Sequence, residues 1–512
     1  MRLLAFVVSV ALLIASPVRA QDVSLIDILV AKGVLSKEEA RKLRGKKDGK
    51  AEQAALISVL KAKGILDEDD MARLQSPSPV VTTTPEVRER LQRLESQQQT
   101  LVMQAQTQAE QQAKAVEELK KTTVADVKKN IDWLNRFSFF GDIRVRHEGF
   151  YQDRVTARNR QRLRLRFGAR LQVSEEIEGG LRLVSGDPNE IIANNQTLTD
   201  SFSRKPINID NAYITIRPGK TLGLEKPFFS ITGGKFSVPF FRPRAIMGSE
   251  MVFDEDLSPE GLAEEITLFE GKEGAVVRSV KLAAGQWAIK EFAVERDSFM
   301  IGEQLQIALA PTAKTQLTFA VADYYFLRSD ALAQERNRNT QLSMTNSVVL
   351  KDGTVVRGGN VINPNAANPI QRFAGGFHLF NTGAQFVWDT GYPQWPFTMM
   401  VDFAHNFQAK FGDDNAYLIG AGIGQTKTPG DWAFSAAWTR IETDAVLSMF
   451  TLSDYGRRGG TNVQGPVLKA DYMLLPRLTL TAKGFFVNFI DRPNGLPNSS
   501  VNRMQFDAQF MF

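Results

Sequence analysis

Hydrophobic and polar residues along the chain follow two different periods, and the change lies at about residue 137. Before it, apolar residues recur at the spacing of a helix; after it, they alternate with polar residues, as in a strand that has one apolar face. The clearest alternation is at 162–173, where apolar side chains face one side and four arginines and a glutamine face the other. This pattern predicts strands that separate an apolar from a polar environment.

The length and spacing of these segments predict a membrane barrel. They run to 10–13 residues, their polar faces are strongly charged, and short and long connections alternate between them. A soluble sheet can also alternate, but this combination is typical of outer-membrane barrels, whose strands of about 9–11 residues face lipid outside and water inside. The expected fold is an all-β transmembrane barrel of about 16 antiparallel strands, preceded by a small α-helical module and a coiled coil.

An even number of strands returns both ends of a bacterial barrel to the periplasm. The apolar stretch 262–270 would make the number odd, so we assign it to a long outer loop that spans about 237–273. The expected strands are 137–148, 160–173, 177–185, 208–217, 228–236, 274–283, 286–295, 302–310, 314–326, 376–389, 396–408, 416–426, 431–442, 465–475, 477–490 and 501–512.

The segment before the barrel divides into four parts. Residues 1–20 have an early arginine, a short apolar run and small residues before a cleavage point, which is the pattern of a secretory signal peptide. Residues 21–75 contain a repeat of a helix–turn–helix pattern and predict a periplasmic helical repeat module. A linker rich in proline and threonine follows at 76–85, and 86–134 predict a coiled coil with a polar centre. A single soluble helix is the alternative for this last part.

The composition narrows the function. The 512 residues include no cysteine and three histidines, and the net charge is +5, which is too small and dispersed for a nucleic-acid surface. Without cysteine, thiolate nucleophiles, disulfides and zinc fingers are excluded. No nucleophile, P-loop or metalloprotease motif is present. We therefore expect no enzyme, no nucleic-acid partner, no cofactor and no metal.

The densest charged feature is a row of arginines at period 2 on the first two strands, which we call the basic wall. On the inner face of a barrel these charges would favour anions. The alternative is that they pair with carboxylates and stiffen the barrel, and the sequence leaves both open. The predicted wall consists of Arg144, Arg146, Arg162, Arg164, Arg166 and Arg170.

An acidic cluster of Asp254, Glu255 and Asp256 lies in the predicted long loop. If this loop folds into the barrel, its carboxylates would oppose the basic wall across a constriction. It could equally form a solvated cap over the mouth. A divalent-cation site between Asp254 and Asp256 is a weaker alternative.

The C-terminal strand alternates Phe506, Phe510 and Phe512 with polar residues, and the chain stops on phenylalanine. Such an ending resembles the assembly signal of Gram-negative outer-membrane barrels, which implies the barrel-assembly machinery as a partner. Further aromatic residues, namely Tyr392, Trp388, Trp395 and Trp432, lie near expected periplasmic strand ends, where aromatic girdles occur.

Several segments resemble a porin family of Gram-negative outer membranes, the putative porins. The stretch from Glu264 to Gly285 departs from the family pattern and leaves the sixth strand in doubt. The segments that carry the resemblance are Phe140 to Arg146, Ser185 to Asn189, Asn195 to Leu198, Ser203 to Tyr213, Gly233 to Phe236 and Ser258 to Ala263. The resemblance implies an oligomeric outer-membrane pore.

These observations predict an outer-membrane porin that lets small hydrophilic solutes or ions diffuse passively, with an anion preference if the basic wall is unpaired. The alternative is a structural anchor that tethers the membrane to the cell wall through the helical module. Expected partners are outer-membrane lipids, two further copies in a homotrimer and, through the module at 21–75, the cell wall. The barrel at 137–512 would lie in the outer membrane of a Gram-negative bacterium, with the helical module in the periplasm.

Overall fold

The computed structural model describes residues 36–44, 49–62, scattered helical positions between 85 and 117, and 132–512 except 200, 294–295, 358–366, 456–459 and 493–500. It divides into two units, residues 1–120 and residues 121–512. Within the described residues, no helix has the length and hydropathy to cross a membrane.

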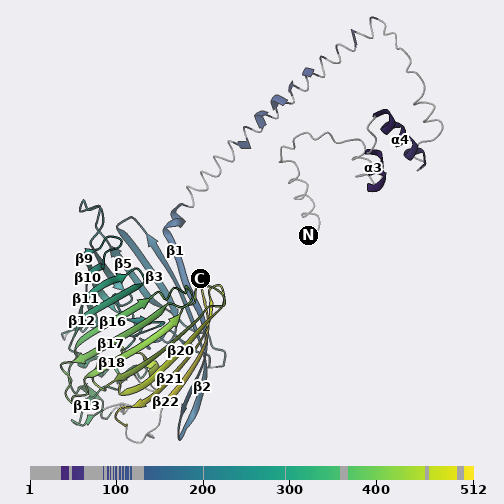
Figure 1. The fold of residues 1–512 in the computed structure, drawn as a ribbon. Coiled ribbons are helices and arrows are strands. Elements are labelled where there is room, and N and C mark those ends of the chain that lie inside the picture. Colours follow the sequence, from purple (N-terminus) through teal and green to yellow (C-terminus); the bar gives the residue numbers. More distant parts are fainter. Residues whose placement is uncertain are drawn as a thin grey trace. The chain divides into compact units, whose positions relative to one another are not determined.

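The second unit is a closed barrel of sixteen antiparallel strands (Figure 1). Each strand pairs with the next one along the chain, and β1 pairs with β22 to close the sheet. The strands are β1 (Phe137–Gln152), β2 (Val155–Gln172), β3 (Ile177–Ser185), β5 (Ile207–Ile216), β6 (Phe229–Lys235), β9 (Glu260–Glu270), β10 (Val277–Lys290), β11 (Ser298–Thr312), β12 (Thr315–Leu327), β16 (His378–Trp388), β17 (Phe397–Asn406), β18 (Asn415–Gly424), β19 (Trp432–Ile441), β20 (Val463–Leu475), β21 (Leu478–Phe489) and β22 (Val501–Met511).

The two faces of the barrel wall differ as the alternation predicts. On β1, the side chains of Ile143 and Val145 are exposed on the outer face, whereas Arg144 and Arg146 are buried on the inner face. Phe506 on β22 continues the outer apolar face. An outer surface of this kind is stable against lipid, and the polar inner face is stable against water.

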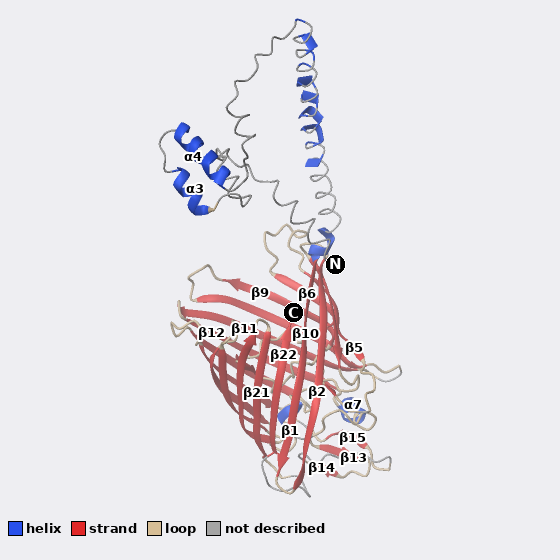
Figure 2. Ribbon diagram, turned by 90° about the vertical axis from the view of Figure 1, so that its right-hand side faces the viewer, coloured by secondary structure: helices blue, strands red, loops and turns tan. Residues whose placement is uncertain are grey.

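The two ends of the barrel also differ. Strand β1 begins and β22 ends at one end, which we call the turn end, where connections are as short as Pro476–Arg477 between β20 and β21. The other end, which we call the loop end, carries the long connections. One of them contains α7 (Asp330–Glu335) and the small sheet of β13 (Val348–Leu350), β14 (Val355–Val356) and β15 (Ile370–Phe373), as Figure 2 shows.

The predicted number of strands is confirmed, but two of the assignments behind it are wrong. The stretch 262–270 is not loop; it lies in β9 and pairs with both β6 and β10. The expected strands 274–283 and 286–295 are not two strands, because β10 runs unbroken from Val277 to Lys290. The other fourteen expected strands each have a counterpart.

The two errors are linked. Dividing β10 at Gly285 counts one strand too many, so parity then excludes 262–270, which is in fact β9, although only Glu264 interrupts its apolar outer face, opposite Ala284. Gly285 resembles a turn residue, but in β10 it makes room for the ring of Trp287, which folds back over it; a Cβ at this position would lie 2.0 Å from that ring. An aromatic ring can cover a strand glycine in this way without ending the strand.

The first unit contains α3 (Lys37–Arg44) and α4 (Gly49–Ala62). Both lie within the residues of the predicted module, 21–75, and α3 begins after Ser36, whose carbonyl accepts a hydrogen bond from the amide of Ala40 at 3.0 Å. The described positions between 85 and 117 are helical. The signal peptide, the linker at 76–84 and most of the predicted coiled coil lie outside the described residues and stay predictions.

Candidate functional site

The inner face of β1 and β2 carries the predicted basic wall. The register places Arg144 opposite Arg164 and Arg146 opposite Arg162, so like charges face each other across the two strands. All four side chains are buried. Because buried cations are stable only when they are paired, the arrangement depends on the carboxylates around them.

Carboxylates on the barrel wall supply part of this pairing. Asp142 lies between Arg164, at 2.9 Å, and Arg166, at 2.5 Å. Asp507 on β22 accepts two hydrogen bonds from Arg146, at 2.7 and 2.8 Å. The wall is therefore an ion-pair network.

A second group of pairs lies at the seam where the barrel closes. Glu148 on β1 is fully buried and accepts hydrogen bonds from Arg503 at 2.9 Å and from Gln505 at 2.8 Å, both on β22. Arg160 on β2 also pairs with Glu148. The carboxylate thus joins the first, second and last strands of the barrel.

Loop carboxylates complete the network. Asp454, in the loop between β19 and β20, pairs with Arg146 at 3.5 Å and with Arg503. Burial alone would raise the pKa of Asp454, but the charges of Arg503 and Arg146 hold it well below its usual range. Among the described residues, the ion-pair network contains seven arginines and seven carboxylates: Arg144, Arg146, Arg160, Arg162, Arg164, Arg166 and Arg503, with Asp142, Glu148, Glu190, Glu255, Asp256, Asp454 and Asp507.

Arg170 differs from the rest of the predicted wall. It is exposed near the turn end, and its guanidinium lies over the ring of Phe140, 4.9 Å from the centroid. Among the residues that the structure describes, no carboxylate lies within salt-bridge distance of it. Arg170 therefore contributes a positive charge that no neighbouring anion cancels.

Residues 236–259, which we call the inner loop, connect β6 to β9 inside the barrel. Gln304 on the inner face of β11 exchanges two hydrogen bonds with the main chain of Phe241, at 2.7 and 3.0 Å. The amide of Arg244 donates to Gln385 of β16 at 2.9 Å, and Ser249 hydrogen-bonds to Asp402 of β17. These contacts hold the loop against the inner faces of three strands, β11, β16 and β17.

Inner-face glycines make room for the inner loop. A Cβ at Gly383 would lie 3.0 Å from Pro243, and a Cβ at Gly422 would lie 2.8 Å from Ile246. At Gly302 it would lie 3.0 Å from the ring of Phe240. The wall is thus shaped to receive this loop, and of the two predicted positions the structure shows the inward one.

The acidic cluster of the inner loop contacts the basic wall directly. Asp256 lies 3.6 Å from Arg166, and Glu255 lies 3.9 Å from Arg164. Burial would raise the pKa of Glu255, but the charges of Arg164 and Arg166 outweigh this and lower the pKa to about 2. The carboxylates therefore meet the arginines at contact distance.

Asp254 is buried deeper in the inner loop. Its carboxylate accepts a hydrogen bond from the amide of Asp256 at 2.8 Å, and burial together with the neighbouring Glu250 raises its pKa. Within the described residues, no group of three or more histidines, aspartates or glutamates is arranged to hold a metal ion.

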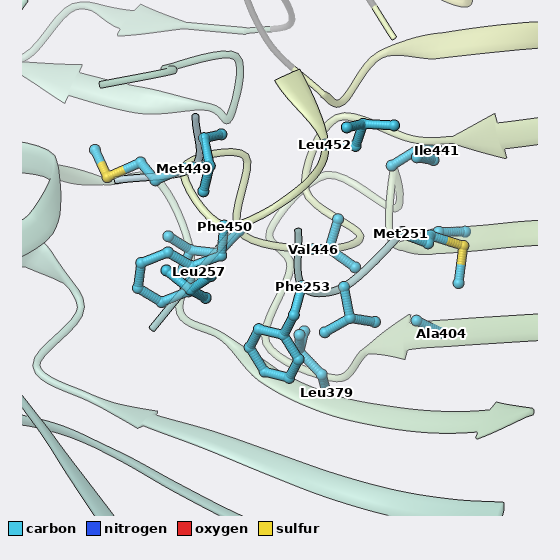
Figure 3. Packing of buried hydrophobic residues seen from close by; sticks show 14 of the residues in the cluster. Met251, Phe253, Leu257, Leu379, Ala404, Ile441, Val446, Met449, Phe450 and Leu452 are labelled. Atoms are coloured by element: carbon cyan, nitrogen blue, oxygen red, sulfur yellow. The ribbon is translucent and has the colours of Figure 1, made fainter. Parts of the chain in front are cut away.

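Apolar residues of two loops pack together inside the loop end (Figure 3). Met251, Phe253 and Leu257 of the inner loop meet Val446 and Phe450 of the loop between β19 and β20. Each of these side chains is buried. The two loops are therefore held against the barrel wall by apolar packing as well as by ion pairs. Figure 3 also shows the remaining labelled members of this packing, Leu379, Ala404, Ile441, Met449 and Leu452.

The titration of Glu250, in the inner loop, predicts that the ion preference of the pore depends on pH. Burial and the adjacent charge of Glu255 raise the pKa of Glu250 to about 7, against the opposing charges of Lys483 and Arg242. Because this pKa lies above that of an exposed glutamate, Glu250 is protonated at low pH and gains its negative charge as the pH rises through 7. The contribution of its protonated form to the stability of the folded barrel is lost over the same rise in pH. Between pH 6 and 8, reversal potentials in a KCl gradient should shift toward cations, and in Glu250→Gln this shift should be much smaller. A shift of equal size in the variant would contradict this assignment.

The other predicted site residues lie as follows. Phe506, Phe510 and Phe512 are exposed on the outer face, and Trp388, Tyr392, Trp395 and Trp432 lie exposed at the turn end. Periodicity alone does not identify Glu250, Asp454, Arg503 and Asp507 as members of the site. The last two alternate with the outer-face aromatics of β22, so pairing the first strand with the last one would have revealed them.

The fold and this geometry agree with a comparison of the sequence with protein families. A family described as "Putative porin" matches three overlapping segments, residues 19–157, 150–371 and 360–512. The chain belongs to this porin family. The family and the barrel place this porin in the outer membrane and indicate a channel rather than an enzyme. A comparison with curated proteins finds no match.

Several solved structures resemble this porin in fold. OprB of Pseudomonas putida is 11% identical, with a TM-score of 0.47, and the alignment covers 75% of this porin and 96% of OprB. OmpF of Salmonella typhi is 9% identical, with a TM-score of 0.41 and coverage of 73% and 97%. OmpT of Vibrio cholerae is 9% identical, with a TM-score of 0.38 and coverage of 73% and 99%.

Proposed function

We propose that this porin forms an aqueous pore through which small hydrophilic solutes and ions diffuse passively, narrowed by the inner loop. The observation that carries the proposal is a closed sixteen-stranded barrel with a charged inner face and a loop bound to that face by specific hydrogen bonds. A barrel of this width has room for a water-filled channel beside its side chains.

The direct test is conductance in a planar bilayer under a KCl gradient. The full mature chain, folded in detergent, should insert and give stable conductance steps, while a heat-denatured sample should give none. A folded barrel that inserts without conducting would refute the proposed pore.

We further propose a weak rather than strong anion preference. The ion-pair network cancels most of the arginine charge, and Arg170 is the residue of the basic wall that has no ion-pair partner in the described part of the chain. The sign of the reversal potential in a KCl gradient reports whether positive or negative fixed charge prevails in the pore.

Replacing Arg170 by glutamine should shift the reversal potential toward cations, because it removes an uncancelled charge near the turn end. The matched control is Arg278→Gln, which removes one positive charge from β10, in outer-face alternation with Leu282. Reversal potentials of both variants under the same KCl gradient measure the effect. Equal potentials in wild type and Arg170→Gln would contradict the assignment.

We also propose that the turn end faces the periplasm and that three copies associate. Two polar side chains support association: His147 and Gln161 hydrogen-bond to each other at 2.7 Å on the outer face of β1 and β2. Polar groups on a lipid-facing surface are costly, and contact with another copy would shield them. Cross-linking and mass measurement of the detergent-extracted protein test the number of copies.

A further inference from the structure

The loop between β19 and β20, residues 442–462, is buried inside the loop end of the barrel. The structure describes all of it except 456–459. Five consecutive residues, 445–449, are each at most 1% exposed. Loops normally run over a protein surface, where water satisfies their main-chain polar groups. This segment is instead enclosed by protein, and we call the loop 442–462 the crossing loop.

The crossing loop contacts opposite sides of the barrel wall. Phe450 lies against Phe326 on the inner face of β12, with 6.0 Å between the ring centroids. Further along, the carboxylate of Asp454 accepts a hydrogen bond from Gln505 of β22 at 2.8 Å and pairs with Arg146 of β1 at 3.5 Å. Since β12 is the ninth of the sixteen strands, it lies about half-way around the barrel from β22 and β1. The loop therefore crosses the lumen.

Main-chain hydrogen bonds join the crossing loop to the inner loop. The amide of Asp254 donates to the carbonyl of Phe450 at 2.7 Å, and the amide of Leu452 donates to the carbonyl of Glu250 at 3.1 Å. Apolar side chains of both loops belong to one cluster (Figure 3). The inner loop also crosses the lumen, because it contacts β11, β16 and β17 on one side and the arginines of β2 on the other. The two loops form one packed unit, which we call the plug.

A third loop holds the start of the crossing loop. The side-chain amide of Asn346, in the loop after β12, donates to the carbonyls of Thr443 and Val446 at 2.7 and 2.8 Å. The side-chain oxygen of Asn346 accepts a hydrogen bond from the amide of Ser448 at 2.8 Å. One buried side chain thus fixes three main-chain groups of the crossing loop.

Asp454 attaches the other part of the crossing loop to the wall, and the wall does not depend on it. Without Asp454, Arg146 still pairs with Asp507 at 2.7 Å, and Arg503 still pairs with Glu148. Removing this carboxylate therefore detaches the crossing loop from β1 and β22 and leaves both arginines paired. Packed units change between discrete arrangements rather than deforming gradually. The loss of one attachment should accordingly release the plug.

We propose that the crossing loop and the inner loop act as one movable plug, and that Asp454 is the latch that holds the plug across the lumen. The structure shows the latched state, in which the plug limits the size of the solutes that pass; the released state is wider. The inference deepens the proposed function and rests on it, because a plug regulates passage only if the barrel conducts. It assigns the size limit to two loops rather than to the inner loop alone.

Reaction with a buried thiol tests the release of the plug. The chain contains no cysteine, so Ser448→Cys introduces a unique thiol at a position that is fully buried in the latched state. A water-soluble maleimide should react only with the released state, at a rate that follows its population. Adding Asp454→Asn should raise this rate by about 10-fold or more, the usual effect of losing a hydrogen bond to a charged group. Adding Asn346→Ala should also raise it.

The matched control is Asp352→Asn. It removes one carboxylate from an exposed turn of the small sheet at the same end of the barrel, and the rate of labelling should stay at that of Ser448→Cys alone. Gel mobility before and after heating shows that each variant is folded.

Single-channel recording in KCl tests the effect on the pore. Asp454→Asn should occupy a level of higher conductance about 10-fold more often than the wild type, for the same reason, and should admit larger polyethylene glycols. Absence of conductance steps in every variant would refute the pore, whereas the labelling rates report on the latch independently. Unchanged labelling in both folded Asp454→Asn and folded Asn346→Ala, an equal increase in Asp352→Asn, or faster labelling without a change in conductance would each overturn the proposal.

Discussion

Replacing Glu148 by alanine is expected to destabilise the folded barrel by about 3–5 kcal/mol, the usual cost of removing one member of a buried ion pair. Glu148 is fully buried at the closing seam, where it pairs with Arg503 and Arg160. Without the carboxylate, Arg160 loses its ion-pair partner and Arg503 keeps only Asp454. Urea titration in lipid vesicles, followed by the gel mobility of folded and unfolded barrel, measures the change.

A matched control is Glu303→Ala on β11. Glu303 is exposed on the outer face, opposite Asp323. Removing it relieves a repulsion between like charges, so stability should stay the same or rise. Equal losses in Glu148→Ala and Glu303→Ala would refute the role of the seam.

A double variant separates what the intact ion pair contributes to the free energy of unfolding from the penalty of leaving one buried charge without its partner. Replacing both Glu148 and Arg503 by methionine removes the charges together, and apolar substitutes for a buried pair are often tolerated. The double variant should therefore recover part of the stability lost in Glu148→Ala. The recovery should be incomplete, because Arg160 and Asp454 each still lose a partner.

Alternation predicts strands well when one face is uniformly apolar, and this explains both the successes and the errors. The predicted strand 177–185 has the same bounds as β3, and most other predicted strand boundaries lie within a few residues of the observed ones. The total of sixteen was correct because one missed strand, β9, and one strand divided in two, β10, cancelled each other. Parity limits the number of strands, but it does not test each assignment.

The side-chain pairs were less accessible to sequence reasoning. The arginines of β1 and β2 were visible at period 2, but the choice between an open basic wall and a paired network depended on Asp507 and Asp454, which are hundreds of residues away in the chain. Their contact follows from barrel closure and from the path of a loop. Local periodicity contains no information on either.

One feature of the sequence reflects the path of the inner loop inside the barrel. Gly302, Gly383 and Gly422 lie on strands where a side chain would be expected, and each of them faces a residue of this loop. A glycine in a strand interior often marks the close approach of another segment. Three such glycines on separate strands are consistent with a loop that follows the inner wall.

Removing the inner loop should raise single-channel conductance at least about twofold, because a barrel of sixteen strands is wide enough for water once nothing crosses it. Lys235 and Glu260 are paired neighbours at the ends of β6 and β9, so residues 236–259 can be replaced by an Asn-Gly turn without moving either strand. The variant should still fold, since the replaced segment contributes no strand to the barrel wall. Conductance in KCl measures the result.

The control is a shorter loop elsewhere at the same end. Replacing Lys410–Gly412, in the connection between β17 and β18, by a single glycine shortens a loop that has no hydrogen bond to the inner loop among the described contacts. This variant should conduct like the wild type.

If replacing the inner loop leaves the conductance of a correctly folded barrel unchanged, the narrowest part of the pore lies elsewhere, and the arginine–carboxylate contacts at Arg164 and Arg166 do not control passage. If conductance rises and the pH-dependent shift in reversal potential assigned to Glu250 disappears with it, the inner loop sets both the width and the charge of the pore.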